Sequence, residues 1–193
     1  MPVEVEAKMR LNDPDRLEGA LRALGVSDAE DIFEVNTYFD RMDDGLRKSD
    51  QGLRLRTERR GTGDAAKQTH IITHKGPRQA GHIKTRSETE VVVDDAGNAR
   101  ALLEALGYVP RLTFEKHRRR YRLDDCCVDV DLLPHIGRFV EVEGPNEASV
   151  DRVRARLGLA DEPIIQPSYA TMLAQHVAEH GLDPKSLTVD VGG

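Results

Sequence analysis

Charged and apolar residues alternate along most of the predicted strands of this chain. At its start, Glu4, Glu6 and Lys8 are separated by Val5 and Ala7. Because successive side chains of a strand point to opposite faces, the three charges share one face and the apolar residues share the other. The alternation recurs in residues 53–56, 84–90, 116–120, 128–131 and 140–143. Dense charges of both signs on nearly every strand favour a barrel with a charged lumen and helices outside.

The side chains that share the charged face nearly cancel in charge. The cations are Lys8, Arg54, Arg56, Lys75, Lys84, Arg86, Lys116, Arg118 and Arg120. The anions are Glu4, Glu6, Glu88, Glu90, Asp129, Asp131, Glu141 and Glu143. Burying so many charges is costly unless they are paired, and one or two divalent cations on the carboxylates would make the lumen positive. We therefore expect a lumen that holds a highly anionic ligand together with metal.

Helix signals punctuate the strands and define one domain. Apolar stripes begin at Asp13-Pro14, at Asp94 or Asp95, and at Asn146, and each ends at a glycine, Gly25, Gly107 and Gly158 respectively. A last helix should begin near Pro167-Ser168. Strands are expected at about 31–41, 108–122, 68–76 and 82–93, with Gly76-Pro77 as a break. We expect a single domain over residues 1–178 and a C-terminal tail over 179–193.

Composition excludes several classes of protein. The chain has 193 residues and a net charge of −6, which argues against a general nucleic-acid binder. No apolar run is long enough to span a membrane, and the chain starts directly with a strand pattern. Cys126 and Cys127 are adjacent and make no metal-binding spacing. These features predict a cytoplasmic protein with neither nucleic-acid nor membrane partners.

The charged residues suit phosphate and a hard metal ion. Arginine binds phosphate oxygens through two parallel hydrogen bonds, and lysine acts as a compact positive charge. Carboxylates without neighbouring His or Cys favour Mg²⁺ or Mn²⁺ over zinc.

Seven ordered blocks of sequence resemble one known family. Glu4-x-Glu6-x-Lys8 resembles the ExExK signature of the CYTH superfamily, the triphosphate tunnel metalloenzymes. The blocks that follow are 36–40, 53–56, 73–77, 86–90, 115–119 and 131–143, and the last ends in Gly137-x-Phe139-x-Glu141-x-Glu143. Ser168-Tyr169 before an apolar helix also fits, so the resemblance covers roughly residues 3–175.

The resemblance implies an α+β fold, an eight-stranded antiparallel tunnel that binds a triphosphate with Mg²⁺ or Mn²⁺. It implies phosphate-binding roles for Lys8, Arg54, Arg56, Lys75, Arg86, Lys116 and Arg118, with Lys8, Lys75 and Arg118 as catalytic candidates. It implies metal-binding roles for Glu4, Glu6, Asp131, Glu141 and Glu143. Strand parity alone adds Lys84 and Arg120 to the phosphate set and Asp129 to the metal set. Residues 132–136 depart from the family pattern, which leaves the metal geometry near Asp131 open.

Several residues have plainer interpretations. Glu88 and Glu90 fit either metal binding or ion pairs that orient lumen cations. His74 and His117 have the parity of outward-facing surface residues, as does Arg119. Gly61-Thr62-Gly63 fits a hairpin turn better than a phosphate loop, because no Gly-Lys-Ser/Thr follows.

Three functions fit this pattern. The first is a reaction like that of class IV adenylyl cyclases, in which the ribose 3′-hydroxyl of ATP attacks the α-phosphorus and releases pyrophosphate and cyclic AMP. The second is hydrolysis of inorganic tripolyphosphate or of a nucleoside or thiamine triphosphate. The third, a non-catalytic nucleotide- or polyphosphate-binding module, would not need the carboxylates. Oligomeric state stays open, with a homodimer implied only by resemblance to the cyclase branch.

Overall fold

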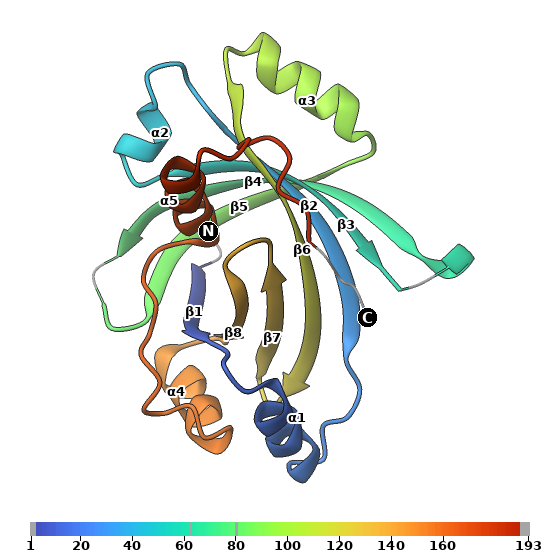
Figure 1. The fold of residues 1–193 in the computed structure, drawn as a ribbon, viewed down its shortest axis with the longest axis vertical. Coiled ribbons are helices and arrows are strands. Elements are labelled where there is room, and N and C mark those ends of the chain that lie inside the picture. Colours follow the sequence, from blue (N-terminus) through green and yellow to red (C-terminus); the bar gives the residue numbers. More distant parts are fainter. Residues whose placement is uncertain (1–2, 62, 80, 190–193) are drawn as a thin grey trace.

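Eight antiparallel strands close into a barrel in the computed structural model, which describes residues 3–61, 63–79 and 81–189 (Figure 1). The strands are β1 (Val3–Arg10), β2 (Glu30–Asp40), β3 (Gly52–Arg60), β4 (Lys67–Gln79), β5 (Lys84–Val93), β6 (Val109–Leu123), β7 (Cys126–Leu133) and β8 (Gly137–Glu143). Their order around the barrel is β1-β5-β4-β3-β2-β6-β7-β8, and β8 pairs with β1 to close it. The predicted eight-stranded antiparallel barrel is confirmed.

Five α-helices lie outside the barrel: α1 (Pro14–Ala23), α2 (Gly45–Lys48), α3 (Ala96–Ala105), α4 (Glu147–Arg156) and α5 (Tyr169–His180). The predicted helix starts are confirmed, because the side chains of Asp13, Asp95, Asn146 and Ser168 each accept a hydrogen bond from the amide three residues later. In Figure 1, α1 and α4 lie near one end of the barrel and α2 and α3 near the other. No helix among the described residues is long and apolar enough to cross a bilayer.

The hydrophobic core lies between the barrel wall and the helices. One cluster packs Leu17 and Leu21 of α1, with Val150 and Val153 of α4, against the outward residues of β1, β7 and β8. A second cluster joins α5 to β6 and β8, and a third joins α3 to β2 and β3. In the first and third clusters the alternation sends apolar side chains outward under the helices. The strand residues of the second cluster, Leu112, Phe114, Leu133 and Phe139, share the face of the lumen charges, so α5 packs on apolar side chains inside the barrel.

The structure differs from the sequence prediction at two places. β4 does not stop at Gly76-Pro77 but continues to Gln79 through a register shift between Lys75 and Arg78, where one extra residue is accommodated as a bulge. The unpredicted helix α2 has only four residues. Asp40 stabilises its start by accepting the amide hydrogens of Leu46 and Arg47, both at 2.9 Å.

The segment after α5 adds no helix or strand, but its described part is attached to the barrel. Leu187 forms an isolated bridge with Phe114 of β6 and is only 3% exposed. Its amide donates to the Thr113 carbonyl, and its carbonyl accepts from the Glu115 amide. The proposed division at residue 178 stays a prediction.

Candidate active site

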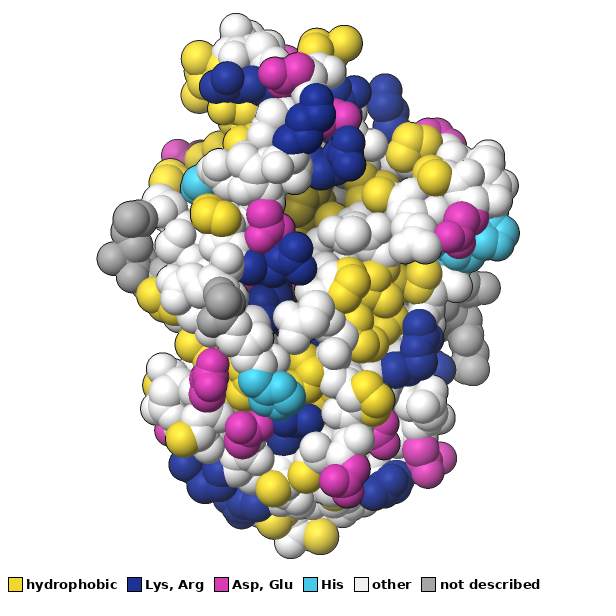
Figure 2. Space-filling model, turned by 90° about the vertical axis from the view of Figure 1, so that its left-hand side faces the viewer, with side chains coloured by type: hydrophobic (Ala, Val, Ile, Leu, Met, Phe, Trp, Pro, Cys, Tyr) yellow, Lys and Arg dark blue, Asp and Glu magenta, His cyan; other side chains and the backbone are white. Residues whose placement is uncertain are grey.

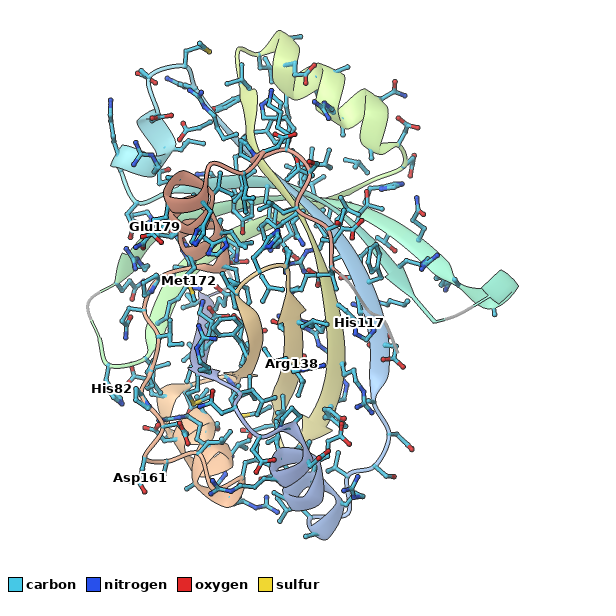
Figure 3. All side chains as sticks on the ribbon, viewed as in Figure 1. His82, His117, Arg138, Asp161, Met172 and Glu179 are labelled. Atoms are coloured by element: carbon cyan, nitrogen blue, oxygen red, sulfur yellow. The ribbon has the colours of Figure 1, made fainter. Side chains whose placement is uncertain are left out.

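A cavity of about 1100 Å³ occupies the barrel interior. Nitrogen- and oxygen-bearing side chains crowd the inside of the barrel (Figure 3), and Figure 2 shows Lys and Arg side chains with carboxylates near the centre of one face. All nine predicted lumen cations line the cavity, as do six of the eight predicted anions. The other two, Asp129 and Asp131, are fully buried beside it. The alternation in the sequence thus brings together the residues it singled out.

Arg118 lies at the centre of one group of ion pairs. Its Nε and Nη2 atoms are each 2.6 Å from an Asp131 oxygen, and Nη2 is 2.7 Å from Glu141. It also pairs with Asp129, whose two oxygens accept hydrogen bonds from Arg120 at 2.8 and 2.7 Å. Burial works to lower the pKa of Arg118, but Asp131 and Asp129 outweigh it and hold the pKa well above its ordinary value. In this structure guanidinium groups therefore occupy the oxygens of Asp129 and Asp131.

A second part of the cavity has positive potential. Burial, and then the neighbouring Arg54, lower the pKa of Arg56. Burial is also the main reason why the pKa of Lys8 is lowered. Burial alone would raise the pKa of the Tyr38 phenol, yet Arg54, Lys75 and Arg56 lower it below its ordinary value. The shift of Tyr38 and the effect of Arg54 on Arg56 indicate an excess of positive charge around these two side chains, so an entering anion would be stabilised there. The shift of Lys8 comes from its burial, while Glu141 and Glu6 act in the opposite direction.

A third part of the cavity has negative potential. Glu6 of β1 lies directly opposite Glu143 of β8, and Glu4 follows Glu6 on the same face. Burial, then Glu4 and Glu6, raise the pKa of Glu143 to about 7. One oxygen of Glu4 is buried without a hydrogen-bond partner among the described residues. Lys84 neutralises part of this charge by pairing with Glu6 and by lying 3.6 Å from Glu4.

This carboxylate group fits a hard divalent cation in its chemistry. Glu4, Glu6 and Glu143 offer only oxygen donors, which suit Mg²⁺ or Mn²⁺, and an unpaired buried carboxylate oxygen is costly. Among the described residues, no group of three or more carboxylate, imidazole or thiol side chains is already placed to bind one metal ion. A cation would therefore require the glutamate side chains to rotate toward it.

The remaining predicted residues lie in the same cavity. Lys75 pairs with Glu88 and lies 3.4 Å from Glu4. Glu90 accepts a hydrogen bond from Thr73 and lies 3.7 Å from Arg54. Glu88 and Glu90 thus take the orienting role that was one of their two interpretations.

Arg86 differs from the other cations in its partners. Its Nε atom donates to the Gly76 carbonyl at 2.8 Å and its Nη2 atom to the Asp50 carbonyl at 2.8 Å. Both acceptors are backbone groups, so Arg86 links β5 to the bulge of β4 and to the turn that precedes β3. Its predicted phosphate-binding role stays a prediction.

The sequence prediction missed the lumen face of β2. Glu34 is fully buried, with Arg56 at 3.1 Å and Lys116 at 3.1 Å. Asn36 donates to Glu34 at 3.2 Å and accepts from Arg56 at 2.9 Å. Glu34, Asn36 and Tyr38 recur at every second position, which was the available signal, but Ile32 shares their face and interrupts the charged pattern.

Residues expected to face away from the lumen do so. His74 is exposed and contacts Gln51, and His117 lies 3.6 Å from Asp31 on the outside of β2. Arg119 pairs with Glu18 of α1. The Gly61–Gly63 stretch connects β3 to β4 as a hairpin, although Thr62 lies outside the described residues.

Comparisons with known proteins agree with this architecture. Residues 2–157 match the CYTH domain. A Methanocaldococcus jannaschii protein named as a candidate adenylate cyclase is 30% identical over 73% of this chain and 76% of its own length. Adenylate cyclase CyaB of Aeromonas hydrophila is 32% identical over 89% of both chains.

Solved structures have the same fold. The PH1819 protein of Pyrococcus horikoshii superposes with a TM-score of 0.76 at 26% identity, covering 90% of this chain and 99% of that one. HpAC1 of Hippeastrum, a candidate adenylyl cyclase described as having a dominant triphosphatase activity, has a TM-score of 0.63 at 19% identity. It covers 94% of this chain and 98% of its own. With a barrel of this topology, a charged cavity inside it and a matching domain over four fifths of its length, the chain belongs to the CYTH family.

Proposed function

We propose that the protein is an enzyme that binds a triphosphate and a divalent cation together in the barrel and acts as an adenylyl cyclase. The observation that carries this proposal is the separation of potential within one cavity. Arg54 and Arg56, beside Tyr38, form a positive part, and Glu4, Glu6 and Glu143 form a negative part. A triphosphate that carries a metal ion complements both.

The positive part would hold the phosphate chain. Arg54 is 7% exposed, and its Nε atom is buried without a hydrogen-bond partner among the described residues. That donor is available to a phosphate oxygen, as arginine is well suited to bind. Lys8 and Lys116 extend the positive surface, and Arg56 lies beside them. These cations would neutralise the charge that develops on the leaving pyrophosphate.

Three further residues have proposed roles that depend on rearrangement. Lys75 would exchange Glu88 for a phosphate oxygen. Arg118 would act on the substrate only by giving up part of its contact with Asp131 and Glu141. Arg120 would do so only by giving up part of its contact with Asp129. Arg118 and Arg120 keep all their contacts if their role is instead to hold these carboxylates in place.

Glu4, Glu6 and Glu143, with Glu141 next to them on β8, would hold Mg²⁺ or Mn²⁺. When bound, the ion supplies Lewis-acid stabilisation of phosphate charge and lowers the pKa of a coordinated hydroxyl. In the metal-free protein the pKa of Glu143 is about 7 because burial, Glu4 and Glu6 disfavour its charge, and a bound cation would relieve this repulsion. The metal-binding roles of Asp129 and Asp131 stay predictions.

Two observations favour ATP as the substrate. The relatives at 30% and 32% identity are named as adenylate cyclases. Four of the eight Phe and Tyr residues line the cavity, namely Tyr38, Phe39, Phe114 and Tyr169. An aromatic lining suits a nucleoside better than an inorganic triphosphate, because a base can stack on it. ATP also agrees with the cytoplasmic location that the sequence predicts.

Hydrolysis of a triphosphate is the second candidate. The same cations would serve a reaction in which a water molecule attacks the γ-phosphorus. The triphosphatase activity described for HpAC1 belongs to a protein with the same fold.

Phosphorus NMR with purified protein separates these functions. ATP and tripolyphosphate would each be incubated with Mg²⁺ or Mn²⁺, with the Arg54→Gln variant as the control for contaminating enzymes. Pyrophosphate and cyclic AMP from ATP are the expected products. Orthophosphate with ADP, or pyrophosphate with orthophosphate from tripolyphosphate, would replace the cyclase by the hydrolase. No turnover of either substrate would contradict both.

A further inference from the structure

Tyr169 carries a buried hydroxyl group that no described residue satisfies. It is the first residue of α5, lines the cavity and is 9% exposed. Its phenolic oxygen is buried and has no hydrogen-bond partner among the described residues. Buried polar atoms are almost always paired in folded proteins, so an unpaired one inside a cavity points to a ligand atom that would complete it.

The ring of Tyr169 lies among the proposed phosphate-binding cations. Lys8 Nζ is 4.3 Å from the ring centroid and Lys116 Nζ is 5.8 Å from it. Phe139 contacts the ring edge-on, with a centroid distance of 5.2 Å, and fixes its position from the barrel wall. Lys8 lies on β1 and Lys116 on β6, so the ring of Tyr169 is close to lysine side chains from two strands of the barrel.

The hydroxyl is held in its protonated form. Burial, then the carboxylates of Asp131 and Glu141, raise the pKa of Tyr169 well above its ordinary value. Neither carboxylate accepts a hydrogen bond from the Tyr169 hydroxyl, and both already accept hydrogen bonds from Arg118. The phenol is therefore a donor in need of an acceptor.

We propose that the Tyr169 hydroxyl donates a hydrogen bond to a phosphate oxygen of the bound triphosphate, next to Lys8 and Lys116. This inference rests on the proposed function, because it takes the triphosphate as the ligand. It makes α5 part of the phosphate site rather than only a cover for the apolar surface of β6 and β8.

Binding should consequently attach α5 more firmly to the barrel. Thr171, Ala174 and Gln175 of the same helix also line the cavity. A ligand held both by barrel cations and by the first residue of α5 would suppress local opening of the helix. The hydrogen exchange of α5 amides therefore reports the contact independently of catalysis.

The variant Tyr169→Phe tests the hydroxyl alone, since the ring, its burial and its contact with Lys8 are kept. Isothermal titration with tripolyphosphate in Mg²⁺ should show an affinity at least about tenfold lower than that of the original protein, as for loss of a hydrogen bond to a charged group. Tripolyphosphate should slow exchange in α5 of the original protein and do so less in the variant.

The matched control is Tyr121→Phe. Tyr121 lies on β6 and is 3% exposed. It packs in the cluster under α1, away from the cavity. This variant should bind tripolyphosphate as the original protein does. Equal affinity and equal exchange in Tyr169→Phe and the original protein would overturn the inference and leave the proposed function standing. Failure of the original protein to bind tripolyphosphate or ATP would overturn both.

Discussion

Glu34 shows how a single buried carboxylate organises the lumen. Its side chain is almost completely buried and lies 3.1 Å from both Arg56 and Lys116. Burial alone would raise its pKa, but Arg56 and Lys116 outweigh it and hold the pKa well below its ordinary value. Removing this charge leaves Arg56 and Lys116 only their more distant carboxylates, Glu58 at 3.9 Å and Asp131 at 3.5 Å.

We therefore expect Glu34→Gln to lower the free energy of unfolding by about 3–5 kcal/mol. Glu18→Gln is the matched control, because Glu18 pairs with Arg119 at a partly exposed site where an ion pair contributes about 1 kcal/mol or less. Urea denaturation of both variants at neutral pH measures the difference. Equal losses would contradict the central position we assign to Glu34.

Glu143 predicts an unusual pH dependence of the metal-free protein. Its pKa of about 7 in the folded state lies above the ordinary value of 4.5. The folded protein therefore binds a proton that the unfolded chain has released between these values, and stability falls as pH rises through that range. At about 1.4 kcal/mol per unit of pKa difference, the loss above pH 7 is at most about 3 kcal/mol.

Glu143→Gln removes this ionisation. In the presence of a chelator, the variant should match the original protein near pH 4.5, become the more stable of the two as pH rises toward 7, and keep this advantage above pH 7. Thermal melts across pH 4.5–8 test this. A difference between the two proteins that does not change with pH would show that Glu143 ionises normally.

The face of the strand on which each side chain lies could be predicted from the sequence, but the ion pairs between these side chains could not. A period of two placed Lys8, Arg54 and Glu141 in one lumen because strand geometry requires it. Which carboxylate meets which cation depends on the strand order, and Arg118 meets Asp131 and Glu141 only because β6, β7 and β8 are neighbours. The sequence alone therefore could not separate orienting carboxylates from candidate metal ligands.

The start of α5 lies at the cavity, which Ser168 and Tyr169 line. Ser168 caps it by accepting the Thr171 amide at 3.2 Å. Asp95 caps α3 in the same way, at the amide of Asn98, but α3 packs on β2 and β3 outside the barrel. The two caps are thus a matched pair that differs in distance from the site.

Ser168→Ala and Asp95→Ala should each destabilise the fold by about 1 kcal/mol, the usual contribution of an N-cap. Only Ser168→Ala should also weaken the binding of tripolyphosphate, because it loosens the first turn that positions Tyr169. Chemical denaturation and isothermal titration of both variants measure the two effects. If both variants bound tripolyphosphate with equal affinity, α5 would not be part of the ligand site.

Elements with local signals were predicted and those held by distant contacts were not. Caps and terminal glycines define α1, α3 and α4 within the sequence itself. By contrast, α2 depends on the side chain of Asp40 across a turn, and the bulge in β4 depends on its pairing with β5. Neither contact can be read from nearby residues.

At the scale of the whole molecule, the barrel places two opposite potentials within one cavity. The cluster of Glu4, Glu6 and Glu143 raises the free energy of the empty protein, and so does the buried Arg56 beside Arg54. A bound divalent cation would reduce the repulsion among the glutamates, and a bound triphosphate would reduce the repulsion between the arginines. Since each bound ligand also attracts the other, their binding should be coupled, and by linkage the coupling must be reciprocal.

Thermal stability measures this coupling directly. A ligand at about 100 times its dissociation constant adds about 2.7 kcal/mol, which corresponds to a rise in Tm of about 5–10 °C for a chain of this length. We expect Mg²⁺ and tripolyphosphate together to raise Tm by more than the sum of their separate effects. Glu143→Gln should reduce the response to Mg²⁺, and Arg54→Gln the response to tripolyphosphate. Sulfate and K⁺ at equal ionic strength serve as controls for screening. Strictly additive shifts would mean that the cation and the triphosphate do not share the cavity, and the positive and negative parts would then have to be explained as two independent sites.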